Sequence, residues 1–247
     1  MDVLPEHFRW LLAVPVYALA YASAVAVFGW MAKRRGVATS GIWLLMQAGL
    51  LGGVIGANAA QLIITGTPGK TIEGGIVGGY LAVVWMKRRL GIARSTGDLF
   101  ALAIPAGEAI GRIGCFIGGC CLGKTAAVAW SIHDHGALRH PTQLYLALAA
   151  ALSFALLLRI ERKRTLPENG LFYTQLALFC LARFVVEFFR EGNVTALGLT
   201  IAQLAAVGGF IFAAYRLAAM VGGLKRHYRR ACPSMLRPPL STGSSSG

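Results

Sequence analysis

The strongest constraint on this chain is a series of seven apolar stretches, most of them close to the roughly 20 residues that a bilayer-crossing helix needs. Of its 247 residues, 56% are hydrophobic and only 14% are charged, whereas soluble domains carry about 25% charged residues. We therefore expect an all-α integral membrane protein with seven transmembrane helices. The expected spans are Trp10–Met31, Gly41–Thr65, Gly74–Met86, Asp98–Ile117, Pro141–Leu158, Gly170–Phe189 and Leu197–Val221.

The net charge of +14 fits either a nucleic-acid partner or the basic loops of a membrane protein. The basic residues gather after the odd-numbered stretches, in clusters at 33–35, 87–94, 159–164 and 225–237. Because cytoplasmic loops carry an excess of Lys and Arg, this pattern predicts an outside N-terminus, a cytoplasmic C-terminus and no nucleic-acid partner. We expect one seven-helix membrane domain over 1–236. The Pro-, Ser- and Gly-rich segment 237–247 is expected to be a disordered cytoplasmic tail.

Two pairs of charged residues lie inside otherwise apolar stretches, where each charge costs at least about 2.5–3.5 kcal/mol on insertion scales. Glu108 and Arg112 are four positions apart, as are Arg183 and Glu187, so each pair can form an ion pair on one helix. In one interpretation these pairs neutralise each other and hold helices together. In the other, the arginines bind an anion from the lipid phase, because a guanidinium fork matches two phosphate oxygens.

Further polar residues accompany these charges in short motifs. The glycine-rich segments are GRIGCFIGGCCLGK at 111–124 and GKTIEGGIVGG at 69–79, and RHPTQLY follows at 139–145. The predicted topology places one set of candidates in the outer half of the membrane, where it is typical of a site for an anionic lipid headgroup. The set is Glu73, Arg112, His140, Gln143, Tyr145, Arg183, Glu187 and Arg190.

Three of the five cysteines lie close together, at Cys115, Cys120 and Cys121. Their spacing matches no common zinc pattern and no CxxC redox pair. Three interpretations remain open. The cysteines are small buried residues that permit close helix packing, or thiols with a functional role, or ligands of a metal site.

Three motifs resemble conserved segments of one enzyme family. GRIGCFIGGCCLG resembles the signature of the bacterial prolipoprotein diacylglyceryl transferases, RHPTQLY resembles their HPSQLYE segment, and RFVVEFFRE at 183–191 resembles a third conserved stretch. The motifs follow one another in the family's order, and the resemblance extends from about Tyr17 to Asn193. It implies a multi-pass protein of the bacterial plasma (inner) membrane with seven spans and an outside N-terminus.

The resemblance also implies an activity. Members take phosphatidylglycerol, an anionic phospholipid, and transfer its diacylglyceryl group to the lipobox cysteine thiol of a prolipoprotein signal peptide, releasing glycerol 1-phosphate. It implies no cofactor and no metal, and makes Arg112 and Arg183 a phosphate clamp. The candidate catalytic residues are Arg112, Arg183, Glu73, His140 and Glu187. The candidate substrate-binding residues are Tyr17, Gly114, Cys115, Cys120, Gly123, Gln143, Tyr145 and Arg190.

Four positions depart from the family pattern. Cys115 stands in place of an Asn, Cys120 and Leu146 each in place of a Glu, and Glu73 in place of a His. Glu73 is a candidate replacement for that His, because a carboxylate can also accept a proton from a thiol. The departures keep two alternatives open: a related phospholipid-using transferase with a different acceptor, and a non-enzymatic lipid-binding membrane protein.

Overall fold

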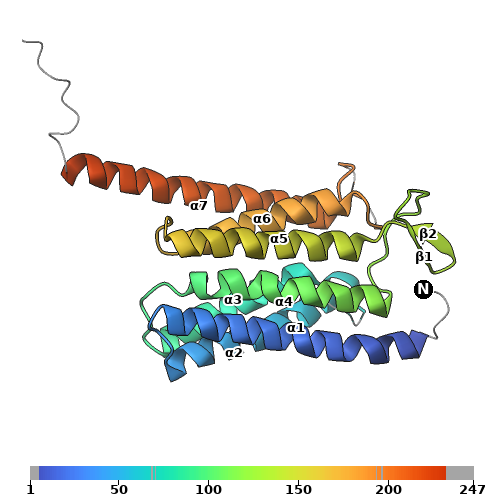
Figure 1. Cartoon of the computed structure of the whole chain (residues 1–247), viewed down its shortest axis with the longest axis horizontal. Helices are drawn as coiled ribbons and strands as arrows, with labels where there is room; N and C mark the ends of the chain where they lie inside the picture. Colours follow the sequence, from blue (N-terminus) through green and yellow to red (C-terminus); the bar gives the residue numbers. More distant parts are fainter. Residues whose placement is uncertain (1–5, 68, 70, 193, 196, 232–247) are drawn as a thin grey trace, which may run out of the picture.

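The computed structural model describes residues 6–67, 69, 71–192, 194–195 and 197–231, so the predicted tail at 237–247 lies outside the described residues. Within this part the chain forms helices and one small β-hairpin (Figure 1). The elements are α1 (Glu6–Arg34), α2 (Ser40–Thr65), α3 (Ile72–Arg89), α4 (Gly97–Gly118), β1 (Ile132–Asp134), β2 (Ala137–Arg139), α5 (Thr142–Lys163), α6 (Gly170–Glu187) and α7 (Ile201–Ala231).

Each expected span corresponds to one of these helices. Among the described residues, six helices are long and apolar enough to cross a membrane, and α3 is not among them, because its 18 residues include Glu73 and the basic run Lys87–Arg89. The seventh helix begins at Ile201 rather than at Leu197, because the preceding residues form a turn in which the N–H of Thr195 donates to the carbonyl of Leu199 (2.8 Å).

The fold is all-α as expected, with one small addition that was not predicted, the antiparallel hairpin of β1 and β2 between α4 and α5. Asp134 pairs with Ala137, which leaves a two-residue loop. Both loop residues, His135 and Gly136, have positive φ angles of 50° and 73°. Two-residue loops with this backbone match the twist of the flanking strands, so four residues suffice to reverse the chain.

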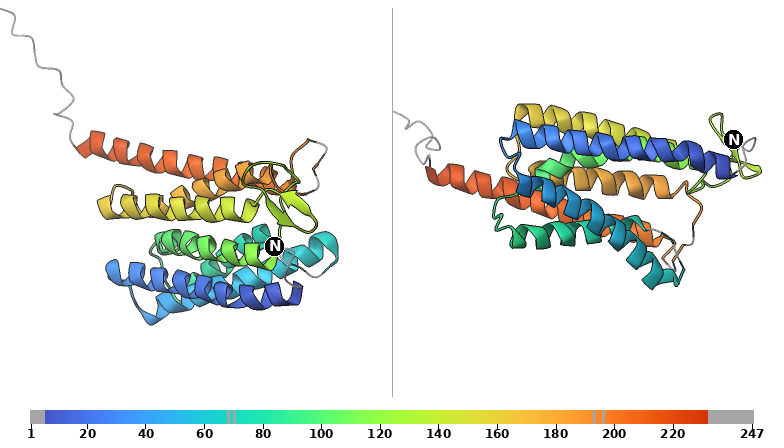
Figure 2. Two further views of the ribbon diagram at one scale, coloured as in Figure 1. Left: turned by 45° about the vertical axis from the view of Figure 1, so that its right-hand side comes forward. Right: turned by 90° about the horizontal axis from the view of Figure 1, so that it is seen from below.

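Helix α4 lies at the centre of the bundle, packed against α1, α5 and α6, while α2 packs on α3 and α6 on α7. Figures 1 and 2 show the long helices running side by side. At one end lie the β-hairpin and the start of α1, and we call this the hairpin end. At the other lie the C-terminal ends of α1, α3 and α5, whose last turns are basic, and we call this the basic end.

Glycines bring α4 directly onto α1. Gly107, Gly111, Gly114 and Gly118 recur at helical spacing, and the atoms nearest to a Cβ placed on each belong to α1. The Tyr17 ring lies against Gly114, where an added Cβ would be 3.0 Å from it. Small residues at such spacing let membrane helices approach until their backbones nearly touch. The glycine density of the motif therefore sets the α1–α4 contact.

A second glycine interface joins α2 to α3. A Cβ on Gly78 would lie 2.7 Å from the Cα of Gly56, and a Cβ on Gly52 would lie 2.7 Å from the carbonyl oxygen of Gly78. Contacts this short leave no room for any side chain. The glycines of α3 lower its hydropathy, and the same glycines allow it to pack closely against α2.

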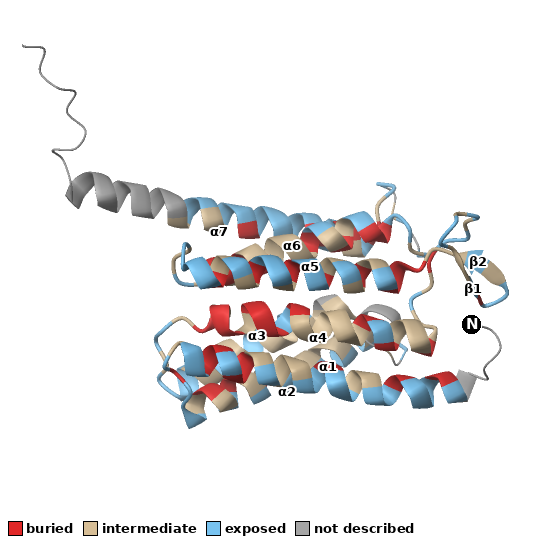
Figure 3. Ribbon diagram, viewed as in Figure 1, coloured by how far each residue is buried: buried red, intermediate tan, exposed pale blue. Residues whose placement is uncertain are grey.

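Burial is inverted relative to a soluble protein (Figure 3). Large apolar side chains face outward, for example Leu51, Ile63 and Tyr215, while Arg112 and Arg183 are buried at 7% exposure each. Apolar exteriors with paired charges inside are typical of membrane proteins. The structure thus supports an integral membrane protein.

A buried ion cluster joins four helices at the basic end. Arg35, which follows α1, lies 3.0 Å from Asp98 of α4 and 2.7 Å from Glu161 of α5. Asp98 also accepts hydrogen bonds from the backbone N–H groups of Asn169 (3.0 Å) and Phe172 (3.1 Å) at the start of α6. Side chains such as Phe28 and Leu102 pack densely at this end. The basic end therefore forms the fixed base of the bundle.

We expect Gly78→Ala to destabilise the protein by about 1–3 kcal/mol, because the added methyl overlaps α2. Gly75→Ala is the matched control on the same helix, since its Cβ would make only ordinary contacts of 3.4 Å and 3.6 Å. Thermal unfolding in detergent measures both. Equal melting temperatures for the two variants would contradict the close α2–α3 contact.

We expect Asp98→Asn to destabilise the protein by about 1.5–3 kcal/mol, because it removes one of the two carboxylates that Arg35 contacts and the charged acceptor of two helix-start N–H groups. Glu168→Gln is the control, since Glu168 is exposed in the adjacent α5–α6 connection and exposed substitutions usually change stability by less than about 0.5 kcal/mol. Denaturant titration of the purified protein compares them. If Asp98→Asn loses no more free energy of unfolding than Glu168→Gln, the ion cluster does not hold the helices together at the basic end.

Candidate active site at the hairpin end

The three sequence motifs meet at the hairpin end. The segment after α4 runs between the end of α6 and the start of α5, bridging Gly123 to Arg190 and Thr125 to Arg139. Its Lys124 N–H donates to the carbonyl of Phe189 (2.8 Å) and its Lys124 carbonyl accepts from the N–H of His140 (3.0 Å). Gly123 lies so close to the His140 carbonyl that a Cβ would collide with it. Segments distant in sequence are thus fixed by main-chain hydrogen bonds.

The end of α4 sets the position of two cysteines. Gly119 has φ of +67°, its N–H donates to the Phe116 carbonyl (3.2 Å), and the next N–H, of Cys120, donates to the Cys115 carbonyl (3.2 Å). This is the Schellman arrangement, in which the side chains of the two outer residues are commonly in contact. It brings Cys115 and Cys120 together.

Arg112 is held from two directions. Its Nε and Nη2 lie 3.2 Å and 2.9 Å from Oε1 of Glu108, and its Nη1 lies 3.5 Å from Oε1 of Gln143 on α5. Gln143 in turn donates from Nε2 to the carbonyl of Cys121 (2.8 Å). The ion pair expected from the sequence therefore forms, and it is tied to the turn after α4.

Arg183 and Arg190 share one carboxylate. Oε2 of Glu187 lies 3.0 Å from Nη1 of Arg183 and 3.2 Å from Nη1 of Arg190. The other carboxylate oxygen, Oε1, accepts from the hydroxyl of Thr200 (3.3 Å). One buried acid thus orients two arginines, and this second expected ion pair also forms.

The three arginines lie within electrostatic reach of one group, the Cys121 thiol. Interaction with Cys120 lowers the pKa of Cys121, partial desolvation by the surrounding protein raises it, and the positive charges of Arg190, Arg112 and Arg183 lower it further, to about 6. Three cations from two helices and the following turn therefore act on the same small volume. That volume attracts an anion, and guanidinium groups suit phosphate oxygens.

Aromatic residues border the arginines. Nδ1 of His140 lies 3.1 Å from the hydroxyl of Tyr145, which also accepts a hydrogen bond from Nε1 of Trp130 (2.7 Å). The His140 ring packs edge-on against Phe189, with centroids 5.1 Å apart. From α1, the hydroxyl of Tyr17 donates to Sγ of Cys115 (3.4 Å).

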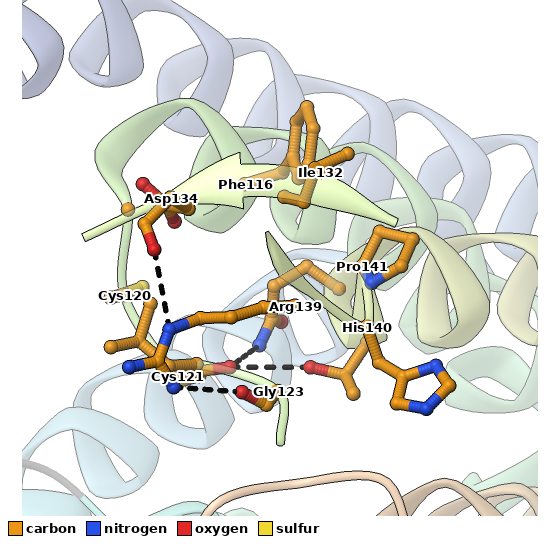
Figure 4. A pocket seen from close by; sticks show the side chains of 13 residues that line it. Phe116, Cys120, Cys121, Gly123, Ile132, Asp134, Arg139, His140 and Pro141 are labelled. Atoms are coloured by element: carbon orange, nitrogen blue, oxygen red, sulfur yellow. Dashed lines mark hydrogen bonds between the residues drawn. The ribbon is translucent and has the colours of Figure 1, made fainter. Parts of the chain in front are cut away.

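A small cavity of about 20 Å³ lies beneath the hairpin, lined by residues of the α4 turn and of the segment 139–143 (Figure 4). This volume holds about one water molecule, so it is too small for a lipid headgroup. Its wall is fixed by Arg139, which donates from Nε to the Asp134 carbonyl (3.2 Å) and from Nη1 to the Gly123 carbonyl (3.0 Å).

Sequence reasoning missed the residues that hold the hairpin. Arg139 also pairs with Glu191 (2.8 Å), and Arg9 of α1 pairs with Asp134 (2.9 Å) while donating to the Ile117 carbonyl (3.1 Å). The signal available was the His-Gly pair at 135–136, a dipeptide suited to a two-residue turn. The partners Arg9 and Asp134 are far apart in the chain and carry no pattern that joins them.

Twelve of the thirteen predicted site residues lie in the motif segments or on the adjoining face of α1, and the remaining one is Glu73. Its backbone lies in the first turn of α3, a helix that packs on α2, and its side chain is not described. A role for Glu73 stays a prediction. Among the described residues, no group of three or more His, Cys, Asp or Glu side chains is arranged to hold a metal ion.

Comparison with known proteins settles the family. The family model for prolipoprotein diacylglyceryl transferase matches residues 5–219. The chain belongs to this family. All three motifs that meet at the hairpin end fall within the matched region.

Curated relatives carry the name phosphatidylglycerol–prolipoprotein diacylglyceryl transferase. One from Geobacter sulfurreducens is 32% identical over 206 residues, covering 75% of this chain and 78% of the relative. One from Vibrio vulnificus is 31% identical over 250 residues, covering 89% and 86%. One from Campylobacter curvus is 36% identical over 147 residues, covering 58% of this chain and 54% of the relative.

We expect Cys121 to remain reactive at mildly acid pH. Because its lowered pKa keeps the thiolate populated down to about pH 6, alkylation by iodoacetamide should reach half its maximal rate near pH 6, rather than near the ~8.5 of an ordinary thiol. Arg190→Gln removes a positive charge and should move this midpoint upward. Peptide mass spectrometry reads the site, and Cys121→Ser identifies its peptide. A midpoint near 8.5 in the unmodified chain contradicts the effect of the three arginines on this thiol.

Proposed function

We propose that this chain transfers the diacylglyceryl group of phosphatidylglycerol to the lipobox cysteine thiol of a prolipoprotein, releasing glycerol 1-phosphate. The observation that carries the proposal is that Glu108 and Glu187 hold Arg112, Arg183 and Arg190 at one end of an apolar helix bundle, within electrostatic reach of one thiol. The names of the relatives supply the substrates, and the arginines supply a place for the phosphate.

The reaction is a displacement at carbon. The acceptor thiol loses its proton to a base, and its sulfur attacks the glyceryl carbon that bears the phosphate. A carbon–sulfur bond forms, the carbon–oxygen bond to phosphate breaks, and glycerol 1-phosphate carries away the electron pair. Negative charge grows on the departing phosphate, so cations already oriented toward it lower the barrier most.

Arg112 and Arg183 form the phosphate clamp, with Arg190 beside them. Glu108 and Glu187 hold the guanidinium groups in place, so little reorganisation is needed as the charge develops. Seven further residues shape the substrate site: Tyr17, Gly114, Cys115, Cys120, Gly123, Gln143 and Tyr145.

Glu73 and His140 are the two candidates for the base that accepts the proton of the acceptor thiol. The His140 ring lies against Tyr145 and Phe189 at the edge of the site, where a thiol arriving from outside the bundle passes. Glu73 occupies the position at which family members carry a His.

The membrane arrangement follows from the position of the basic residues. The basic end lies on the cytoplasmic side, since Lys and Arg concentrate there, and the hairpin end lies outside with the N-terminus. All seven helices, α3 included, span the bacterial inner membrane as one domain over 1–236. The excess of Lys and Arg is therefore explained by membrane topology, and it needs no nucleic-acid partner.

The test incubates purified protein with phosphatidylglycerol labelled in its acyl chains and a lipobox peptide, and measures thioether-linked product. Wild type should label the peptide. Arg112→Gln and Arg183→Gln should each lower kcat/KM by about 10²–10³-fold, the loss typical of removing a preorganised donor. Arg94→Gln, an exposed arginine near the basic end, should stay within twofold.

A folding control separates chemistry from stability. Glu108→Gln/Arg112→Gln removes both charges of the pair, so no buried charge is left alone, and it should be well folded yet as inactive as Arg112→Gln. An unlabelled peptide with wild-type protein, or full activity in Arg112→Gln, overturns the proposal. A labelled product other than the peptide would assign the chain to a related transferase with another acceptor.

A further inference from the structure

Three cysteines lie close together at the turn that ends α4. The Schellman arrangement places Cys120 next to Cys115, and the Cys120 thiol lies 3.5 Å from the Cys115 carbonyl. Cys121 directly follows Cys120 in this turn. Cys120 thus lies between the other two cysteines along the turn. By the resemblance of the sequence motif, Cys115 and Cys120 stand where the family carries an Asn and a Glu.

The outermost thiol is also the one best placed to react. Cys121 is exposed, whereas Cys115 and Cys120 are half-buried. Cys121 has φ of +60°, a conformation that side-chain-bearing residues seldom adopt. The arginines that surround it stabilise its thiolate, and the thiolate is the form that attacks disulfides.

We propose that Cys115 and Cys120 are a reversible dithiol–disulfide pair, loaded through Cys121, that controls the neighbouring site. This pair links the end of α4 to the residue that follows its capping glycine. Disulfides form in oxidising compartments such as the bacterial periplasm, which is the side on which the proposed orientation places the hairpin end.

The oxidant is an external disulfide, and the exchange balances. The Cys121 thiolate attacks it, forming a mixed disulfide and releasing the first external thiolate. Cys120 attacks the Cys121 sulfur, releasing the second external thiolate and giving a Cys120–Cys121 bond. Cys115 then attacks Cys120, and Cys121 leaves as a thiolate. The protons of Cys115 and Cys120 pass to the two released thiolates.

Closing this bond alters the proposed active site directly. Tyr17 loses its thiol partner at Cys115, and the turn that carries the Cys121 carbonyl becomes fixed. That carbonyl holds Gln143, which contacts Arg112, so the change reaches the phosphate clamp. This consequence rests on the proposed function, whereas formation of the disulfide does not.

The first experiment uses a Cys180→Ser/Cys232→Ser background, which leaves only the three clustered cysteines. Purified protein is treated with oxidised glutathione, digested without reduction and analysed by mass spectrometry. The expected result is a Cys115–Cys120 linkage with Cys121 free, which dithiothreitol reverses. Adding Cys121→Ser should slow its formation at least tenfold. A stable glutathione adduct at Cys121, a lasting Cys120–Cys121 linkage, or no oxidation at all overturns the proposal.

The second experiment compares transfer activity in the oxidised and reduced states of each protein. The background protein should lose at least fivefold on oxidation and recover with dithiothreitol, while Cys120→Ser in the same background should show a ratio near one. An unchanged ratio despite a confirmed disulfide overturns control of the site. If the reduced protein has no transfer activity at all, the proposed function fails. The mass-spectrometry experiment still shows independently whether the Cys115–Cys120 disulfide forms.

Discussion

Every part of this structure depends on keeping charge out of hydrocarbon. Each buried charge in a bilayer costs several kcal/mol unless it is paired, and the chain concentrates its buried charges in two groups. At the basic end, Arg35 joins Asp98 and Glu161 and ties four helices together. At the hairpin end, Glu108 and Glu187 hold Arg112, Arg183 and Arg190. The first group anchors the helices to one another at the basic end. The second group presents cations that lie within electrostatic reach of one thiol, that of Cys121.

Glycine makes the second group possible. The run Gly107–Gly118 lets α4 lie on α1, which brings Tyr17 to Cys115, and Gly119 ends the helix so that the chain can turn back beneath the hairpin. Gly123 then admits the His140 carbonyl, where any side chain would collide. The same glycines that weaken the hydropathy signal of the motif are therefore the ones that let three segments meet.

Much of the fold could be predicted from the sequence, because apolar length and basic clustering are local signals. Each predicted span corresponds to a helix, and both i,i+4 ion pairs form as their spacing indicated. The hairpin was missed because its strands are three residues each, too short for a periodic pattern. The start of α7 was misplaced because Leu197 and Leu199 are apolar residues within a turn. The roles of Glu73 and of the other site residues stay predictions.

The sequence by itself determined the membrane class, the approximate helices and the resemblance to the transferase family, since these depend on composition and on motifs of neighbouring residues. Only the tertiary structure decided which residues meet. The Arg9–Asp134 pair joins positions remote in the chain, and so does the contact of Gln143 with both Arg112 and the Cys121 carbonyl. The physical reason is that such contacts arise from how helices pack and where a turn redirects the backbone, and neither leaves a local pattern in the sequence.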